Sequence, residues 1–365
     1  TRKSLADLKA ATTVPVMREL VADKRRKTNI QLRGNFMDLG KEVTAGVPAA
    51  FHPLPAELTS APNRLALAKW LIDENNPLTA RVAVNHLWMR HLGTPLVPTV
   101  FEFGRKGNPP THPELLDWLA VEFMEGRGDR GEGSATETNP SSLTPRPSPL
   151  TASPWSMKHL HRLIVLSSTY RMSSSSAEND SAKADPDDVY YWHRTPIRLE
   201  AQVVRDALLQ LAGELDLTRG GPSLPTVAQQ FSKRRSLYFV HSHNDHNKFL
   251  STFDDASVLE CYRRADSIVP QQALALENSA IVTTQAAKIA DRIFNDVSAK
   301  GDATDEKFVN ECFRRILGSE ATAEELSVCV EEIARLRAIP DNNASRIQTA
   351  LVLALLNHND FITVR

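Results

Sequence analysis

The chain has 365 residues, which is enough for one large hydrophobic core or two moderate ones. Its 43 basic and 44 acidic side chains leave a net charge of −1, which argues against a broad surface for nucleic acid or for an anionic membrane. No apolar run approaches the ~20 residues that span a bilayer. The first residues, TRKSLADLKA, include neither an initiator Met nor a signal peptide, so we expect a piece of a longer protein.

Residues 1–60 are predicted to be an extended segment that contains one β-hairpin. VPVMREL and KTNIQLRGNF alternate apolar and polar side chains, and the charged turn ADKRRK separates them. This pattern favours two paired strands. The stretch at 40–62 is punctuated by Pro and Gly, so it is predicted to run extended over a helical body.

Residues 61–125 are predicted to form a unit of three helices. Asn63 and Asn76 are expected to cap the first two, and Gly93 to end the second. Thr111 and Glu114 have the spacing of a capping box for the third. The side chains expected to face inward are Leu65, Ala68, Leu71 and Ile72 in the first helix, Val82, Leu87, Trp88 and Met89 in the second, and Leu115, Leu116, Trp118, Leu119 and Phe123 in the third.

Residues 126–155 are dense in Gly, Ser, Thr and Pro and hold almost no large apolar side chain. Such a segment buries too little surface to order itself, so we expect a disordered, low-complexity insertion. It contains the tripeptide Arg-Gly-Asp at 127–129, but a three-residue match in a biased tract is weak evidence for an adhesion site.

Residues 156–365 are predicted to form a helical body with one strand near 236–241, where RRSLYFVH alternates. A long helix near 195–214 is expected to bury a stripe of Leu199, Val203, Ala207, Leu208 and Leu211. The predicted fold is therefore mainly α: a multi-helix body with a small β-sheet of about three strands, in which the strand near 236–241 joins the N-terminal hairpin.

Three cysteines are too few and too scattered for a disulfide framework. Cys312 and Cys329 lie at similar distances from the turn at Gly318, so antiparallel helices would bring them opposite each other. In an oxidising compartment they could form a disulfide worth about 3 kcal/mol. Two buried free thiols are the alternative that we favour.

The richest group of possible metal ligands is HSHNDHNK at 241–248. On a strand His241 and His243 share a face, and Asp245 and His246 follow directly, so the four could converge on zinc or a similar ion. The alternative is a strand end that runs into a polar turn, where His and Asn bond the backbone.

The other candidates depend on weaker patterns. His86 and His91 are five residues apart and do not share a helix face, and His159 and His161 do not either. Glu200 and Arg205 could bind a carboxylate or catalyse a reaction, although ion pairs that tie the helix to its neighbours are the expected explanation. No common nucleophile, phosphate-loop, dinucleotide or zinc-protease motif is present.

Several stretches together resemble one known family. NRLALAKWLIDENNPLTARVAVNHLW, FEFGRKGNPPTHPELLDWLAVEF, WSMKHLHRLIVLSSTYRMSS, DPDDVYYWHRTPIRLEAQVVRDALL, RRSLYFVH and SIVPQQALALENS are similar to the planctomycete-specific C-terminal domain of unknown function. The resemblance implies an exported, periplasmic or extracellular protein whose upstream domains are cytochrome-c-like. The residues at 126–155 depart from the family, which passes between the flanking helices directly. No haem-attachment motif is present, so the fragment is expected to hold no cofactor, with haem only on upstream domains.

Two functional hypotheses follow. The first is a non-catalytic interaction or scaffolding module of an exported, cytochrome-c-linked multidomain protein, which binds a polysaccharide or a partner protein. The second is a metal-dependent or carboxylate-based hydrolase that uses the tract from His241 to His246, with Glu200, Arg205 and Asp245 as candidate catalytic residues. A deep cleft that gathers these polar groups would favour the second hypothesis.

Overall fold

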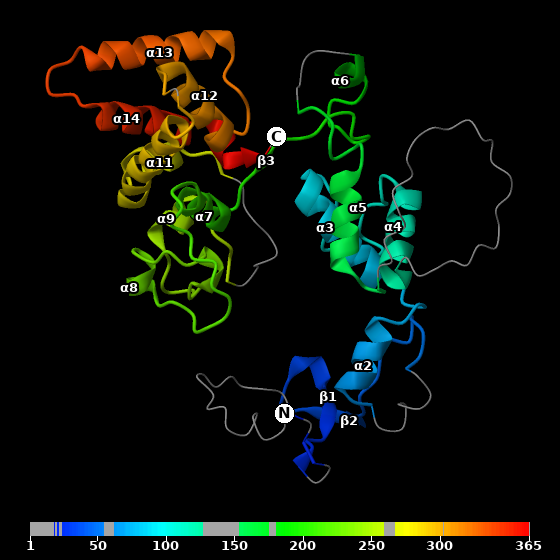
Figure 1. The fold of residues 1–365 in the computed structure, drawn as a ribbon. Helices are drawn as coiled ribbons and strands as arrows, with labels where there is room; N and C mark the ends of the chain where they lie inside the picture. The colour runs from blue at the N-terminus through cyan, green and yellow to red at the C-terminus, as the bar shows by residue number, and fades with distance from the viewer. Residues whose placement is uncertain are drawn as a thin grey trace, which may run out of the picture. The chain divides into compact units, whose positions relative to one another are not determined.

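The computed structural model describes residues 18, 20–21, 24–54, 62–126, 153–174, 180–258, 267–301 and 303–364. The chain divides into two compact units, unit 1 (Thr1–Thr195) and unit 2 (Pro196–Arg365). The described residues form thirteen α-helices and two two-stranded sheets, which confirms a mainly α fold (Figure 1). None of the described helices is both long enough and apolar enough to span a bilayer.

Unit 1 begins with a hairpin and continues with helices. Its elements are β1 (Thr28–Gln31), η2 (Leu32–Gly34), β2 (Leu39–Val43), α2 (Arg64–Leu71), α3 (Thr79–Leu92), α4 (Pro113–Glu125), α5 (Met157–Leu166) and α6 (Asp180–Ala184). The strands β1 and β2 are antiparallel. The predicted strand KTNIQLRGNF therefore exists, but it pairs with 39–43 rather than with VPVMREL, most of which lies outside the described residues. The predicted insertion at 126–155 also lies almost wholly outside them.

The caps of the three-helix unit are partly as predicted. The Asn63 side chain accepts a hydrogen bond from the Ala66 amide at 2.9 Å and caps α2, and Gly93 ends α3 with φ 81°. The predicted capping box at Thr111 is wrong. Its hydroxyl donates to the Leu96 carbonyl at 3.2 Å instead, so α4 begins at Pro113 without a side-chain cap.

The buried faces of α2 and α4 differ from the predicted stripes. Only Ala66 and Trp70 are buried in α2, because the Trp70 indole donates to the His52 carbonyl at 2.8 Å and fixes which side faces inward. In α4 the buried positions repeat every three or four residues, and Trp118 on the opposite side is 49% exposed. The buried side chains of α4 are Leu116, Leu119, Ala120 and Phe123.

The core of unit 1 lies among α3, α4 and α5. Leu160 and Ile164 of α5 are buried there with side chains of α3 and α4. Trp88 donates its indole N–H to the Tyr191 hydroxyl at 2.9 Å, so the polar atom of the buried indole is satisfied. The predicted helical body of 156–365 is therefore divided: α5 and α6 belong to unit 1, and unit 2 begins at Pro196.

Unit 2 is a helical body closed by a short sheet. Its elements are β3 (Ile197–Arg198), α7 (Ala201–Leu211), α8 (Thr226–Gln229), η4 (Ser236–Tyr238), α9 (Lys248–Thr252), α10 (Pro270–Asn278), α11 (Ala280–Ser298), α12 (Asp305–Ile316), α13 (Ala323–Arg337), α14 (Ala344–Leu356), η5 (Asn359–Ile362) and β4 (Thr363–Val364). The antiparallel pair β3–β4 joins the two ends of the unit. Buried side chains of α7, α11, α12 and α14 form its core.

The structure also tests the predicted capping box of the helix that begins near Thr322 and the state of two cysteines. The capping box of Thr322 and Glu325 is present at the start of α13 and is confirmed. Cys312 is buried and Cys329 half-buried, and both are free thiols, which is the alternative that we favoured for the pair.

The long helix α7 is present, but its buried stripe differs in part from the prediction. The stripe contains Arg205, and Val203 is 44% exposed. Leu208 is buried as predicted, and Leu199, Ala207 and Leu211 pack half-buried against the core, so the error lies in Val203 and in the omission of Arg205. The buried side chains of α7 are Ala201, Val204, Arg205, Leu208 and Leu209.

The strand predicted near 236–241 is absent, and a 3-10 turn, η4, takes its place. The backbone groups that a ladder would need are used locally. The amides of Tyr238 and Phe239 donate to the carbonyls of Arg235 and Ser236, and the Ser236 amide donates to the Asp206 carboxylate at 2.8 Å. The predicted pairing with the N-terminal hairpin is wrong, because among the described residues β1 and β2 pair only with each other, and the segment instead forms isolated parallel bridges at Asp216–Arg234 and Leu224–Phe239.

Candidate functional site

Unit 2 contains a cleft of about 790 Å³, within the roughly 300–1,000 Å³ typical of small-molecule sites. We call it the unit 2 cleft. Its walls come from Arg205 and Leu209 of α7, from Glu214, and from residues of the segments 226–233, 245–252 and 275–288. On α11 the lining positions 281, 284, 285 and 288 follow helical spacing, so one face of this helix forms a wall.

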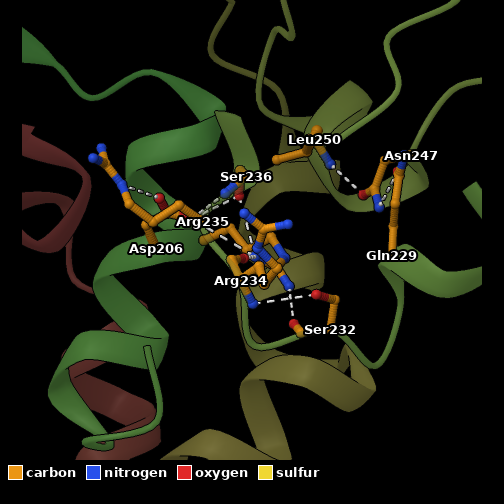
Figure 2. A network of polar contacts seen from close by, with 9 residues as sticks. Asp206, Gln229, Ser232, Arg234, Arg235, Ser236, Asn247 and Leu250 are labelled. Atoms are coloured by element: carbon orange, nitrogen blue, oxygen red, sulfur yellow. Dashed lines mark hydrogen bonds and ion pairs between the residues drawn. The ribbon is translucent and has the colours of Figure 1, made fainter. Parts of the chain in front are cut away.

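The segment 226–236 is held in place from one side by Gln229. This side chain is 1% exposed, and its amide nitrogen donates to the carbonyls of Leu224 and Val240 at 3.1 Å each. Its amide oxygen accepts from Asn247 at 3.2 Å, and Asn247 in turn caps α9 by accepting from the Leu250 amide (Figure 2). Because each of these groups is buried or half-buried and paired, they fix the backbone around the cleft.

Arg205 holds the same segment from the other side. Its guanidinium is 2% exposed and donates to the Ser232 carbonyl, to the Arg234 carbonyl at 3.1 Å and to the Ser236 hydroxyl at 3.2 Å. It also lies 4.5 Å from the centre of the Phe239 ring. Burial lowers the pKa of Arg205 to about 10, and the nearby Asp206 opposes this shift, so the side chain stays charged at neutral pH.

Asp206 completes this network next to Arg205. Its carboxylate accepts from the Ser236 amide at 2.8 Å and from the Ser236 hydroxyl at 2.7 Å, and it pairs with Arg235 at 3.4 Å (Figure 2). The donors of Arg205 and the acceptors of Asp206 are therefore directed at the backbone and side chains of 232–236. The position of Arg205 agrees with the ion-pair explanation of the sequence, since it ties α7 to the next element.

An ion-pair network of three residues forms part of the cleft lining. Glu214 binds Lys233 at 2.7 Å and Lys288 at 2.6 Å. Hydrogen bonds from these two ammonium groups lower the pKa of the Glu214 carboxyl from 4.5 to about 2. Glu214 is thus held ionised, which makes it a poor proton donor for catalysis.

Three polar side-chain atoms on the cleft wall are buried without a hydrogen-bond partner among the described residues. They are the hydroxyls of Thr226 and Ser279 and the amide oxygen of Gln285. Gln285 is the most enclosed residue of the three, with 6% exposure. Such an atom costs about 1–3 kcal/mol while it stays unpaired, so a polar ligand that reached these three groups would gain that free energy.

The cleft lining also includes an exposed aromatic side chain. Phe231 also lines the cleft and is 82% exposed, although it lies within the segment that Gln229 and Arg205 hold in place. A large apolar side chain on a fixed backbone is a common feature of ligand sites, since it offers contact area at little cost in conformational entropy.

The predicted ligands of the His-rich tract lie close together, with the ring centres of His241 and His246 6.3 Å apart, but their ring nitrogens are directed at other partners. His241 bonds the Ala256 carbonyl at 2.5 Å and pairs with Asp255 at 3.4 Å, beside a second cavity of about 210 Å³. His246 contacts the His243 carbonyl at 2.9 Å, so these imidazoles contact the backbone of a turn. No group of three or more His, Cys, Asp or Glu side chains in the described part of the chain could hold a metal ion.

The structure brings some of the candidate site residues together and leaves others apart. Asp245, His246 and Arg205 all line the unit 2 cleft. Glu200 is the N-cap residue of α7 and His243 belongs to the exposed turn, and neither lines the cleft. The carboxylates among the lining residues are Asp245 and Glu214, and the second is held by two lysines, so they do not form the acid–base pair that glycoside cleavage uses.

Unit 1 contains a histidine pair that spacing along the sequence does not indicate. His91 of α3 and His161 of α5 approach to 2.7 Å between ring nitrogens. Burial lowers the pKa of His91, and the charges of His161 and Arg194 lower it further, so a neutral imidazole is favoured. The two histidines come from different helices, and neither helix alone carries a ligand motif that predicts the contact.

Sequence comparison connects the cleft to a family. Residues 63–132 and 128–333 match the family described as PSD1, a protein of unknown function (DUF1553). The chain belongs to this family. No curated protein and no solved structure matches the chain. The matched residues include all of the lining of the unit 2 cleft, so this cleft lies in the part of the chain that the family shares.

Proposed function

We propose that this chain is a non-catalytic binding module and that its unit 2 cleft binds a polysaccharide. The observation that carries the proposal is the set of three unpartnered polar atoms on the cleft wall, with the Gln285 amide oxygen the most enclosed. A ligand that donates to an amide oxygen and both donates to and accepts from hydroxyls would satisfy all three. The hydroxyl groups of a sugar have this capacity.

Phe231 supports the same ligand class. Sugar rings have apolar faces as well as polar edges, and an exposed aromatic ring next to hydrogen-bonding groups offers a surface for each. The fixed segment 226–236 means that little loop ordering is needed on binding, which favours affinity. A catalytic role receives less support, because Glu214 is neutralised by two lysines and Asp245 lacks a second free carboxylate among the lining residues.

The setting that we propose for this module is an exported, cytochrome-c-linked multidomain protein. The support is the resemblance of the segments between Asn63 and Ser279 to the planctomycete-specific domain, and the partners that we propose are cytochrome-like domains of the same protein. Cell fractionation with an antibody against the chain tests the location. Recovery of the full-length protein in the cytoplasm would contradict it.

The binding proposal is tested by titrating the chain with neutral hexasaccharides of different linkage in a calorimeter. Gln285→Leu is expected to weaken binding by about 0.5–1.5 kcal/mol, the usual net contribution of one hydrogen bond. The same substitution should raise the free energy of unfolding, because it removes an unpaired buried amide. Gln271→Leu, at an exposed position of α10 outside the cleft, is the matched control and should change neither quantity much.

Phe231→Ala provides an independent test of the apolar contact. It should weaken saccharide binding and leave the free energy of unfolding nearly unchanged, because the ring is exposed in the free protein. Leu217→Ala, at a 63% exposed site that does not line the cleft, serves as its control. The proposal fails if no saccharide binds, or if binding is insensitive to both Gln285→Leu and Phe231→Ala.

A further inference from the structure

The ionisable side chains of the unit 2 cleft carry an excess of positive charge. Four cationic groups line it, Arg205, Lys233, Lys248 and Lys288, against the two carboxylates Glu214 and Asp245. The whole chain has a net charge of −1, so this local excess is not a consequence of overall composition. A concave site lined by one sign of charge attracts ligands of the opposite sign.

These cations are not equivalent. Arg205 is buried and directed at the 232–236 backbone, and Asp206 lies beside it. Lys233 and Lys288 both pair with the Glu214 carboxylate, so the net charge of these three side chains is positive by one. Lys248 is exposed at the start of α9 and forms no ion pair with the described residues. The charge available to a ligand therefore lies at Lys248 and at the Lys233–Lys288 pair.

The unpartnered amide and one of these ammonium groups lie on the same helix face. Gln285 and Lys288 are three residues apart on α11, so their Cβ atoms are roughly 5–6 Å from each other. That spacing is comparable to the width of one sugar ring. A hydroxyl at Gln285 and an acidic substituent near Lys288 could thus belong to the same or to adjacent sugar units.

We propose that the polysaccharide bound by the unit 2 cleft is an acidic one, whose carboxylate groups pair with Lys248 and with the Lys233–Lys288 pair while its hydroxyls satisfy Gln285. This inference rests on the proposed saccharide-binding function and names the ligand class within it.

The test compares hexagalacturonate with neutral maltohexaose by calorimetry on the full chain at 50 mM and 300 mM NaCl. With Arg205 offset by Asp206, the lining carries three lysines against two carboxylates, and this surplus of one partly exposed charge should make the uronate bind about two- to fivefold more tightly at low salt. The advantage should shrink at high salt, because screening acts on exposed charges. Lys248→Gln should lower the affinity for the uronate about two- to fivefold without affecting the neutral hexamer.

Lys158→Gln, at an exposed position of α5 in unit 1, is the matched control and should leave both affinities unchanged. Lys248 is preferred to Lys288 because removing Lys288 would also take a partner from Glu214 and disturb the cleft wall. Equal affinities for the two hexamers, or an affinity for the uronate that does not depend on salt, would overturn the acidic specificity and leave saccharide binding standing. Failure of every saccharide to bind would overturn both.

Discussion

Arg205 is predicted to be the main stabilising contact of the segment that carries Phe231. We consider the substitution Arg205→Met, which keeps most of the side-chain volume and removes the charge and the donors. The buried carbonyls of Ser232 and Arg234 would lose their partner, as would the Ser236 hydroxyl in part. Each orphaned buried acceptor costs about 1–3 kcal/mol, and breaking a buried charged pair typically costs about 3–5 kcal/mol in total.

The expected loss for Arg205→Met is therefore about 3–5 kcal/mol in the free energy of unfolding, measured by guanidinium titration with far-UV circular dichroism. Hydrogen exchange should show the loss of protection at the amides of Leu224 and Val240. These amides donate to the carbonyls of Tyr238 at 2.8 Å and Leu224 at 2.9 Å. Arg235→Met is the matched control. Its side chain is 49% exposed and pairs with Asp206 at 3.4 Å, so it should cost less than about 1 kcal/mol. If the two variants lose similar free energy, Arg205 does not hold the segment in place and the reasoning is refuted.

Three further predictions concern other parts of unit 2. Thr322→Ala removes the hydroxyl half of the α13 capping box and should cost about 1 kcal/mol in unfolding free energy, whereas Ser327→Ala within the same helix should cost less. Glu214 has a depressed folded pKa, so its stabilising effect is complete above pH 4.5 and is lost as the pH falls toward 2. The melting temperatures of wild type and Glu214→Gln should accordingly differ at pH 6 and converge near pH 2, and a constant gap would contradict the assignment. Burial raises the pKa of the Cys312 thiol, so alkylation followed by peptide mass spectrometry should find it unmodified until the protein unfolds.

Helix ends that depend only on neighbouring residues could be predicted from the sequence. The Asn63 cap, the Gly93 stop and the Thr322–Glu325 box all depend on contacts over a few residues, and the structure contains each of them. Thr111 has the same local signal, but a bond to Leu96 fifteen residues away removes its hydroxyl from the helix end. Local patterns fail where a distant partner competes for the same group.

The strand predicted near 236–241 failed for the same reason. Its alternating side chains fit a half-buried strand, but the Ser236 amide at its start donates to Asp206, about thirty residues earlier, and the chain turns as a 3-10 helix. Nothing in the segment itself indicates such a partner. The exposure of Trp118 has no such distant cause and could have been predicted. Leu116, Leu119 and Phe123 follow helical spacing and define a buried stripe that excludes Trp118.

The cleft could be foreseen only in part. The His-rich tract was a candidate because of its residue types, and Asp245 and His246 do line the cleft, but Ser279 and Thr226 look like ordinary surface residues in the sequence. One signal was available. Gln285 lies in the apolar stripe of α11 between Val282 and Ile289, where a polar side chain is out of place. Arg205 interrupts the stripe of α7 in the same way, so polar residues within apolar stripes were the better guide to this site.

A crystal structure of the full chain with a bound hexasaccharide is the decisive measurement of whether the unit 2 cleft binds sugar. We expect a sugar ring against Phe231, with a sugar hydroxyl donating to the amide oxygen of Gln285. A saccharide bound elsewhere on the chain, with the cleft free of sugar, would contradict it.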